Sequence, residues 1–131
     1  MRFVLDTNTC IYALKLQGRV VERLRDHAPG DLGVTIITVA ELWFGAHKSA
    51  RPSVARREMD GFLEPLDVLP FDREAADAYA RSRFALERVG RPIGERDLLI
   101  ASIALARGLV VVTHNLTEFT RVPGLKTEDW L

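Results

Sequence analysis

Short, strongly apolar runs alternate with helix-like segments along the chain, and this alternation most constrains the fold. Residues 3–5, 34–37, 68–69 and 109–112 are rich in β-branched or bulky apolar side chains, as buried strands are. Segments with helical periodicity separate these runs. Because strand–helix–strand order produces parallel strands covered by helices on both faces, the sequence predicts an α/β protein, a three-layer α/β/α sandwich with a mostly parallel central sheet.

Cap and breaker residues divide the intervening segments into helices. These are expected at residues 7–14, from about residue 20 to before Pro29, at 38–48, 52–63 and 73–89, and around the apolar run 98–105, with Asp97 in the first turn of that last helix. Thr38 to Glu41 has the form of a capping box, in which Glu41 is the residue that reaches back to the helix start. The face of residues 73–89 that is predicted to point inward includes Val89. Residues 126–131 are a candidate for a short edge strand, with Trp130 in the core.

Length and composition predict one compact domain. The 131 residues contain no linker, low-complexity segment or repeat, so residues 1–131 are treated as a single domain. No apolar run approaches the length that spans a bilayer, and the apolar start is too short for a signal peptide. The single cysteine, Cys10, excludes an intramolecular disulfide and is expected to be buried. We therefore expect a cytoplasmic protein.

The charges alone identify no partner. Eighteen Lys and Arg residues balance eighteen Asp and Glu residues. Fifteen of the cations are Arg, whose planar guanidinium makes bidentate contacts with phosphate and suits nucleic acid. A compositional bias accounts for the excess of Arg equally well, so the excess does not decide between nucleic-acid binding and such a bias.

Four polar residues that are far apart in sequence are predicted to meet at one edge of the sheet. Asp6 follows the first strand, and Glu41 lies in the first turn of the helix that leaves the second strand. Asp97 begins the buried helix that returns into the last strand, which Asn115 follows. Because ligands bind at the carboxyl ends of parallel strands, these four residues are the candidate catalytic residues.

Each of these residues also has a local structural explanation. Asp6 and Asp97 suit helix N-termini, where the helix dipole favours a negative charge. Glu41 fits the capping box, and Asn115 suits a turn. None of these explanations requires the four residues to share one edge, so their common position favours a functional site.

Clustered carboxylates repel one another unless a cation neutralises them. Mg²⁺ or Mn²⁺ is the expected cofactor, since hard cations prefer oxygen ligands, and Asp6, Glu41 and Asp97 are the candidate ligands. The three histidines show no paired spacing that would indicate zinc. The Thr7 and Thr113 hydroxyls are placed either to hold a carboxylate or to form local turns.

Five motifs follow one another across essentially the whole chain. They are LDTN at 5–8, AEL at 40–42, IGERDLLIA at 93–101, VTHNLTEF at 112–119 and VPGL at 122–125. In this combination the sequence resembles the PIN-domain ribonucleases, and among them the VapC-type toxins of type II toxin–antitoxin systems.

The resemblance implies an Mg²⁺- or Mn²⁺-dependent endoribonuclease that cleaves RNA, tRNA among the candidates, and inhibits translation until an antitoxin neutralises it. It implies metal ligation by Asp6, Glu41 and Asp97. Asn115 falls where many family members have a fourth acid, and its neutrality puts a tightly held second metal in doubt. Glu95 and Glu118 are candidates for a further carboxylate, although both are expected on the solvated surface.

The resemblance also implies a homodimer and a small antitoxin partner, which in some family members places a basic side chain in the acidic site. Of Trp43 and Phe44, one is expected in the core and the other in an antitoxin groove or buried. Arg91 and Arg96 flank the Asp97 helix start and are candidates for contact with RNA phosphate. A second basic cluster has no assigned role; it consists of Arg51, Arg56 and Arg57.

Three other interpretations fit less well. Phosphatases of the haloacid dehalogenase kind need a second Asp where this chain has Asn8. Receiver domains need an Asp at the end of a middle strand and a partnering Lys, and neither is evident. A PIN-like module that only binds RNA or protein is the remaining alternative, and Asn115 is the single feature in its favour.

Overall fold

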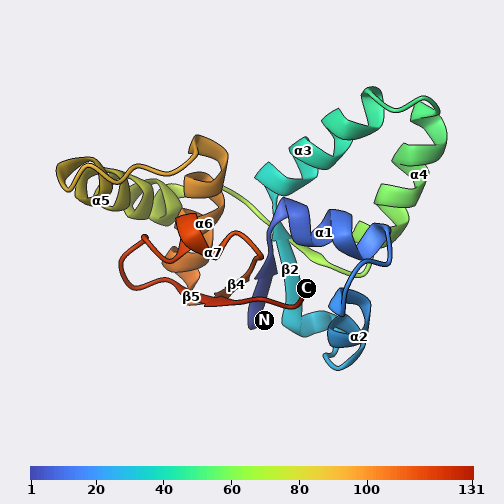
Figure 1. The fold of residues 1–131 in the computed structure, drawn as a ribbon, viewed down its shortest axis with the longest axis horizontal. Coiled ribbons are helices and arrows are strands. Elements are labelled where there is room, and N and C mark those ends of the chain that lie inside the picture. Colours follow the sequence, from blue (N-terminus) through green and yellow to red (C-terminus); the bar gives the residue numbers. More distant parts are fainter.

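A five-stranded, all-parallel sheet forms the centre of the molecule, with strand order β3-β2-β1-β4-β5 (Figure 1). The computed structural model describes residues 1–131. Its elements are β1 Phe3–Leu5, α1 Thr7–Leu14, α2 Val20–Arg25, a 3₁₀ turn Pro29–Asp31, β2 Leu32–Thr35, α3 Ile36–His47, α4 Pro52–Leu63, β3 Asp67–Leu69, α5 Arg73–Arg88, α6 Glu95–Arg107, β4 Val110–Val112, α7 Leu116–Phe119 and β5 Lys126–Glu128.

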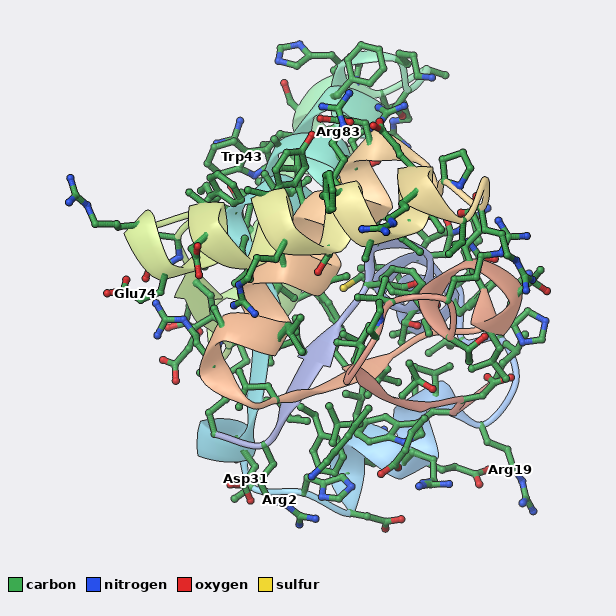
Figure 2. The ribbon with its side chains drawn as sticks, turned by 90° about the vertical axis from the view of Figure 1, so that its left-hand side faces the viewer. Arg2, Arg19, Asp31, Trp43, Glu74 and Arg83 are labelled. Carbon is green, nitrogen blue, oxygen red and sulfur yellow. The ribbon has the colours of Figure 1, made fainter.

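Side chains alternate across the sheet and divide the core into two halves. Val4 and Val111 pack with residues of α5, α6 and α7. Phe3, Leu5 and Val112 face the other side, where they pack with residues of α1, α3 and α4. The two groups of helices lie on opposite sides of the sheet in Figure 1, and in Figure 2 α5 crosses in front of α6. The predicted three-layer sandwich is therefore confirmed.

The boundary between β2 and α3 differs from the prediction. Thr35, in extended conformation, is the N-cap of α3, and its hydroxyl accepts from the Thr38 amide at 3.2 Å. Ile36 and Ile37 are therefore helical although they are β-branched. The capping box at Thr38 is wrong, and Glu41 lies in the second turn, where capping does not account for it.

The predicted helix end at Gly108, the buried residues and the edge strand agree with the structure, and Val89 does not. Gly108 ends α6 in the left-handed conformation, with φ 66°. Cys10 and Trp130 are buried, and β5 is an edge strand. Val89 is a correction, since α5 ends at Arg88 and the Val89 side chain is 67% exposed. No helix combines the length and the apolar character needed to cross a membrane.

Candidate active site

The carboxyl ends of β1, β2 and β4 meet at one edge and bring the predicted site residues together. Asp6 directly follows β1, and Asn115 follows β4. Glu41 is reached through α3, which leaves β2, and Asp97 is the third residue of α6. The charges of Asp6 and Glu41 both raise the pKa of Asp97, and that of Glu41 raises the pKa of Asp6. The three carboxylates are therefore close enough to repel one another.

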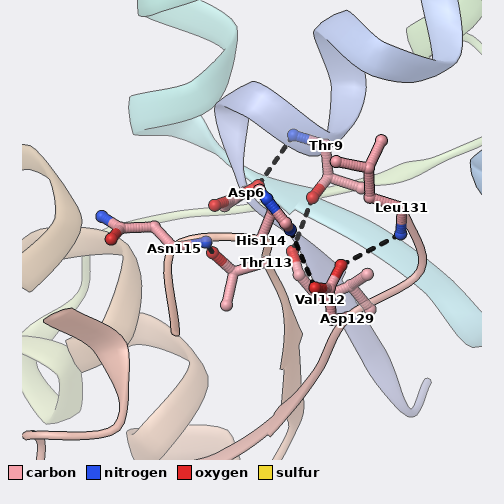
Figure 3. A network of polar contacts seen from close by, with 8 residues as sticks. All are labelled: Asp6, Thr9, Val112, Thr113, His114, Asn115, Asp129 and Leu131. Atoms are coloured by element: carbon pink, nitrogen blue, oxygen red, sulfur yellow. Dashed lines mark hydrogen bonds and ion pairs between the residues drawn. The ribbon is translucent and has the colours of Figure 1, made fainter. Parts of the chain in front are cut away.

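Asp6 both caps α1 and faces the site (Figure 3). Its Oδ1 accepts from the Thr9 amide at 2.8 Å, and Thr9 Oγ1 donates to the Val112 carbonyl at 3.0 Å, which ties α1 to β4. Burial raises the pKa of Asp6, and hydrogen bonds from Thr113 and Thr9 oppose this. Asp6 is only 3% exposed, so its charge is costly to bury without a counter-ion.

Glu41 is held by a neighbouring hydroxyl. Thr7 Oγ1 donates to Glu41 Oε1 at 2.6 Å and also lies 3.1 Å from Thr38 Oγ1. The other carboxylate oxygen, Oε2, lies 3.6 Å from Arg96 Nε. The expectation that Thr7 holds a carboxylate is confirmed.

Asn115 bridges two carboxylates. Its Nδ2 donates to Asp97 Oδ2 at 3.2 Å and to Glu118 Oε2 at 2.9 Å. Burial, then a hydrogen bond with Glu118, then the surrounding negative charges raise the pKa of Asp97 to about 7. Hydrogen bonds from Asp97 and Asn115 lower the pKa of Glu118. Of these two neighbouring acids, Asp97 is therefore the one that more readily takes up a proton.

Of the two candidates for a further carboxylate, Glu118 joins the site, so the preferred prediction of a solvated surface acid is wrong for it. It joins the site because α7 begins at Leu116, one residue after Asn115, so the spacing of three residues puts both side chains on one side of a helical turn. The sequence did contain this i, i+3 spacing. Glu95 behaves differently, because its carboxylate accepts from the Tyr79 hydroxyl.

Of the two basic residues predicted to flank the site, only Arg96 contacts one of its carboxylates. Arg91 forms no ion pair or side-chain hydrogen bond with these acids. A cavity of about 320 Å³ opens at this place, and its lining includes Glu41, Arg96 and Asp97 but no hydrophobic residue. The cavity offers charged and polar groups, as a site for a phosphodiester and a cation would.

Trp43 and Phe44 both lie at the surface, so the expectation that one is in the core is wrong. The buried face of α3 is formed by residues at helical spacing, namely Thr38, Val39, Leu42 and Ala46. This spacing leaves Trp43 36% exposed and Phe44 57% exposed.

The second basic cluster partly surrounds Trp43. The Arg56 guanidinium lies 3.8 Å from the centre of the Trp43 ring and also pairs with Asp60. Arg56, Arg57 and Trp43 line a cavity of about 430 Å³ between α3 and α4. The four site carboxylates do not line this cavity; they are those of Asp6, Glu41, Asp97 and Glu118. The cavity is therefore separate from the edge of the sheet where these four meet, which we call the carboxylate edge.

The donor chemistry of the carboxylate edge suits a hard divalent cation. All the candidate donors are oxygens, and the raised pKa of Asp97 reflects its burial first and then a crowding of negative charge, both of which a bound cation would offset. No group of three or more His, Cys, Asp or Glu side chains is arranged to hold a single ion. Mg²⁺ commonly takes only one or two carboxylates directly and keeps several waters, so the residues present fit it.

Comparisons with known proteins point in one direction. The PIN domain family model matches residues 3–125. The chain is 41% identical over 130 residues to a protein of Shigella flexneri named tRNA(fMet)-specific endonuclease VapC, which covers 99% of this chain and 98% of the relative.

Solved structures agree with this. The structure of DNA-bound VapBC from Salmonella typhimurium matches with a TM-score of 0.95 and 42% identity, covering 100% of this chain and 99% of the other. VapBC-5 from Mycobacterium tuberculosis, described as a member of the VapBC family of toxin–antitoxin systems, matches with a TM-score of 0.68 and 28% identity, covering 98% and 96%.

Proposed function

This chain belongs to the PIN-domain family, and we propose that it is a divalent-cation-dependent endoribonuclease that acts as the toxin of a toxin–antitoxin pair. The observation that carries the proposal is the convergence of four carboxylates and one amide at one edge of the sheet, beside a polar cavity that Glu41 and Asp97 line. Its relatives support RNA as the substrate, since the Shigella flexneri protein is named an endonuclease specific for a tRNA.

We propose Mg²⁺ or Mn²⁺ as the cofactor, with Asp6, Glu41 and Asp97 as the residues that hold it, one or two of them directly and the rest through the waters that the cation keeps. Such a cation supplies the positive charge that activates water for attack on a phosphodiester and stabilises the leaving oxygen. The protein keeps the carboxylates in place through neighbouring donors. Thr7 holds Glu41, Asn115 holds Asp97, and the Thr9 amide holds Asp6.

Glu118 adds a fourth carboxylate beside Asp97, although Asn115 itself is neutral. By bridging Asp97 and Glu118, the Asn115 amide orients both acids, which is the positioning role we assign to it. Position 115 brings no negative charge where many family members have an acid, and Glu118 supplies one within the same turn of chain. A second cation is then compatible with the charge of the site once RNA phosphate is present.

A small antitoxin protein is the proposed partner, since several similar solved structures are VapBC complexes. We further propose that the toxin is a homodimer, as the family resemblance implies, and that it acts in the cytoplasm, where its RNA substrate lies. Sedimentation of the purified chain checks the dimer, and a monomer at micromolar concentration would contradict it.

Cleavage of tRNA by the purified chain tests the catalytic proposal. We expect cleavage with Mg²⁺ or Mn²⁺, none with EDTA, and a loss of at least about 100-fold in Asp6→Asn and Asp97→Asn, because each removes a cation ligand worth several kcal/mol. Asn is as good an N-cap as Asp, so Asp6→Asn keeps the cap of α1. Asp26→Asn, on the surface after α2, is the matched control and should cleave normally.

Two outcomes would reject the proposal. Undiminished cleavage by Asp6→Asn or Asp97→Asn would place the active site elsewhere. RNA binding by the unmodified chain without any cleavage would favour the non-enzymatic binding module.

A further inference from the structure

Arg96 lies where two cavities meet. It is the second residue of α6, next to Asp97, and it lines the polar cavity together with Glu41 and Asp97. It also lines an adjoining trough of about 280 Å³ between α3 and α6, whose walls include Phe44 and Leu99. The side chain of Arg96 is 68% exposed, so its guanidinium has room to move between these two spaces.

Arg96 is the counter-ion of one site carboxylate. Its Nε lies 3.6 Å from Glu41 Oε2, whereas Thr7 holds the other oxygen of Glu41 at 2.6 Å. No other cation forms an ion pair with any of the four site acids. Arg121 acts on Glu118 only through its charge, and it donates to the Pro92 carbonyl. Arg96 therefore pairs with the oxygen of Glu41 that Thr7 leaves free, and this is the oxygen most open to a cation.

Resting on the proposed function, we infer that Arg96 competes with the divalent cation for Glu41 in the free protein and binds RNA phosphate once the cation has displaced it. The ion pair is long, at 3.6 Å, and its guanidinium is exposed to screening by water, so Arg96 leaves Glu41 at small cost. A guanidinium forms bidentate, charge-assisted hydrogen bonds with phosphate, so the released side chain has a better partner in RNA. Arg96 is thus a substrate-binding residue that also lowers the affinity of the free protein for its cation.

The competition is tested by titrating Mn²⁺ into the full-length chain in a calorimeter. Arg96→Gln should bind Mn²⁺ about two- to five-fold more tightly than the unsubstituted chain, the range that the loss of one exposed ion pair allows. Arg88→Gln is the matched control, because it removes the same charge from the exposed surface of α5. It should leave the Mn²⁺ affinity unchanged.

The second role is tested by the fluorescence anisotropy of a labelled single-stranded RNA. Every measurement is made with all the acids of the site intact and with Ca²⁺ in place of Mg²⁺, a hard cation that takes the same oxygen ligands, and gel analysis afterwards checks that the RNA is uncut. Arg96→Gln should weaken RNA binding about three- to ten-fold, and Arg88→Gln should not. Arg96→Lys keeps the charge but loses the bidentate contact, so its RNA affinity should fall between these two values.

The outcomes separate the inference from the function on which it rests. Equal Mn²⁺ affinity in Arg96→Gln and the unsubstituted chain would overturn the competition. Tighter Mn²⁺ binding with unchanged RNA affinity would overturn the role in phosphate binding. Absence of Mn²⁺ binding in every chain, Arg96→Gln included, would overturn the proposed cation site and the competition with it.

Discussion

At the scale of single residues, Asp97 is the site acid whose protonation depends most on its surroundings. Its pKa is raised to about 7 by burial and by neighbouring acids, so the folded protein holds this proton more tightly than the unfolded chain does. Between pH 4 and pH 7 the unfolded chain loses the proton first. The free energy of unfolding of the cation-free protein should therefore fall across this range and then level off.

Asp97→Asn should remove this loss of stability. In EDTA at pH 8 we expect it to raise the free energy of unfolding by about 1 kcal/mol, a value well below the full shift because the residue is only half buried. At pH 4 the gain should vanish, since Asp97 is then protonated in both states for much of the population. Urea unfolding at the two pH values measures both effects, and a destabilised variant at pH 8 would contradict the assigned crowding.

Asn115 is the residue whose amide connects two of the acids. Asn115→Ala removes its donors to Asp97 and Glu118, so we expect the affinity for Mn²⁺ to fall about ten-fold, as is typical when the partner of a metal ligand is lost. Calorimetric titration gives the affinity. Thr117→Ala, in the same short helix, serves as the control, and equal affinities of all three chains would refute the bridging role.

The start of α3 is decisive at the scale of elements, because it sets where Glu41 points. Thr35 caps the helix, so Thr35→Val should lower the free energy of unfolding by about 1 kcal/mol while keeping the shape of the side chain. Thr35→Ser keeps the cap and should lose less. Urea unfolding of the two variants decides the point, and equal losses would show that the hydroxyl does not stabilise the helix.

Sequence periodicity predicted the elements well where one signal dominated. The strand at 109–112, the cap at Asp72 and the stop at Gly108 agree with the structure. The β-branched run at 34–37 was misread because it belongs to two elements, and Thr35 ends the strand by capping the helix. Which face of α3 is buried depends on its neighbours, so the exposure of Trp43 and Phe44 was not readable from the chain alone.

The site was predictable in outline at the same scale. Parallel strands place their carboxyl ends at one edge, so Asp6, Glu41, Asp97 and Asn115 were expected to meet there before any contact was known. Glu118 and the pairing of Arg96 with Glu41 depend on how side chains turn after α7 and α6 begin. The i, i+3 spacing of Asn115 and Glu118 was a usable signal for the first contact, whereas the second follows from the packing of α6 against α3 and not from spacing.

At the scale of the whole molecule, the parallel sheet and its two helical layers bring acids from separate elements to one edge. A cation that binds there binds only the folded protein and should stabilise it. At a Mg²⁺ concentration ten times its Kd we expect the midpoint of thermal unfolding to rise by about 3–6 °C. Asp6→Asn should show no rise, and an equal rise in this variant would place the cation elsewhere.

The central claim is that this edge of the sheet is the active site of a ribonuclease. Mapping new RNA ends after induced expression in bacterial cells, for the unsubstituted chain and for Asp97→Asn, tests the claim most directly. We predict new ends at defined RNA positions with the unsubstituted chain and none with Asp97→Asn, which is expected to fold at least as stably. The same new ends with both chains, or none with either, would contradict the account.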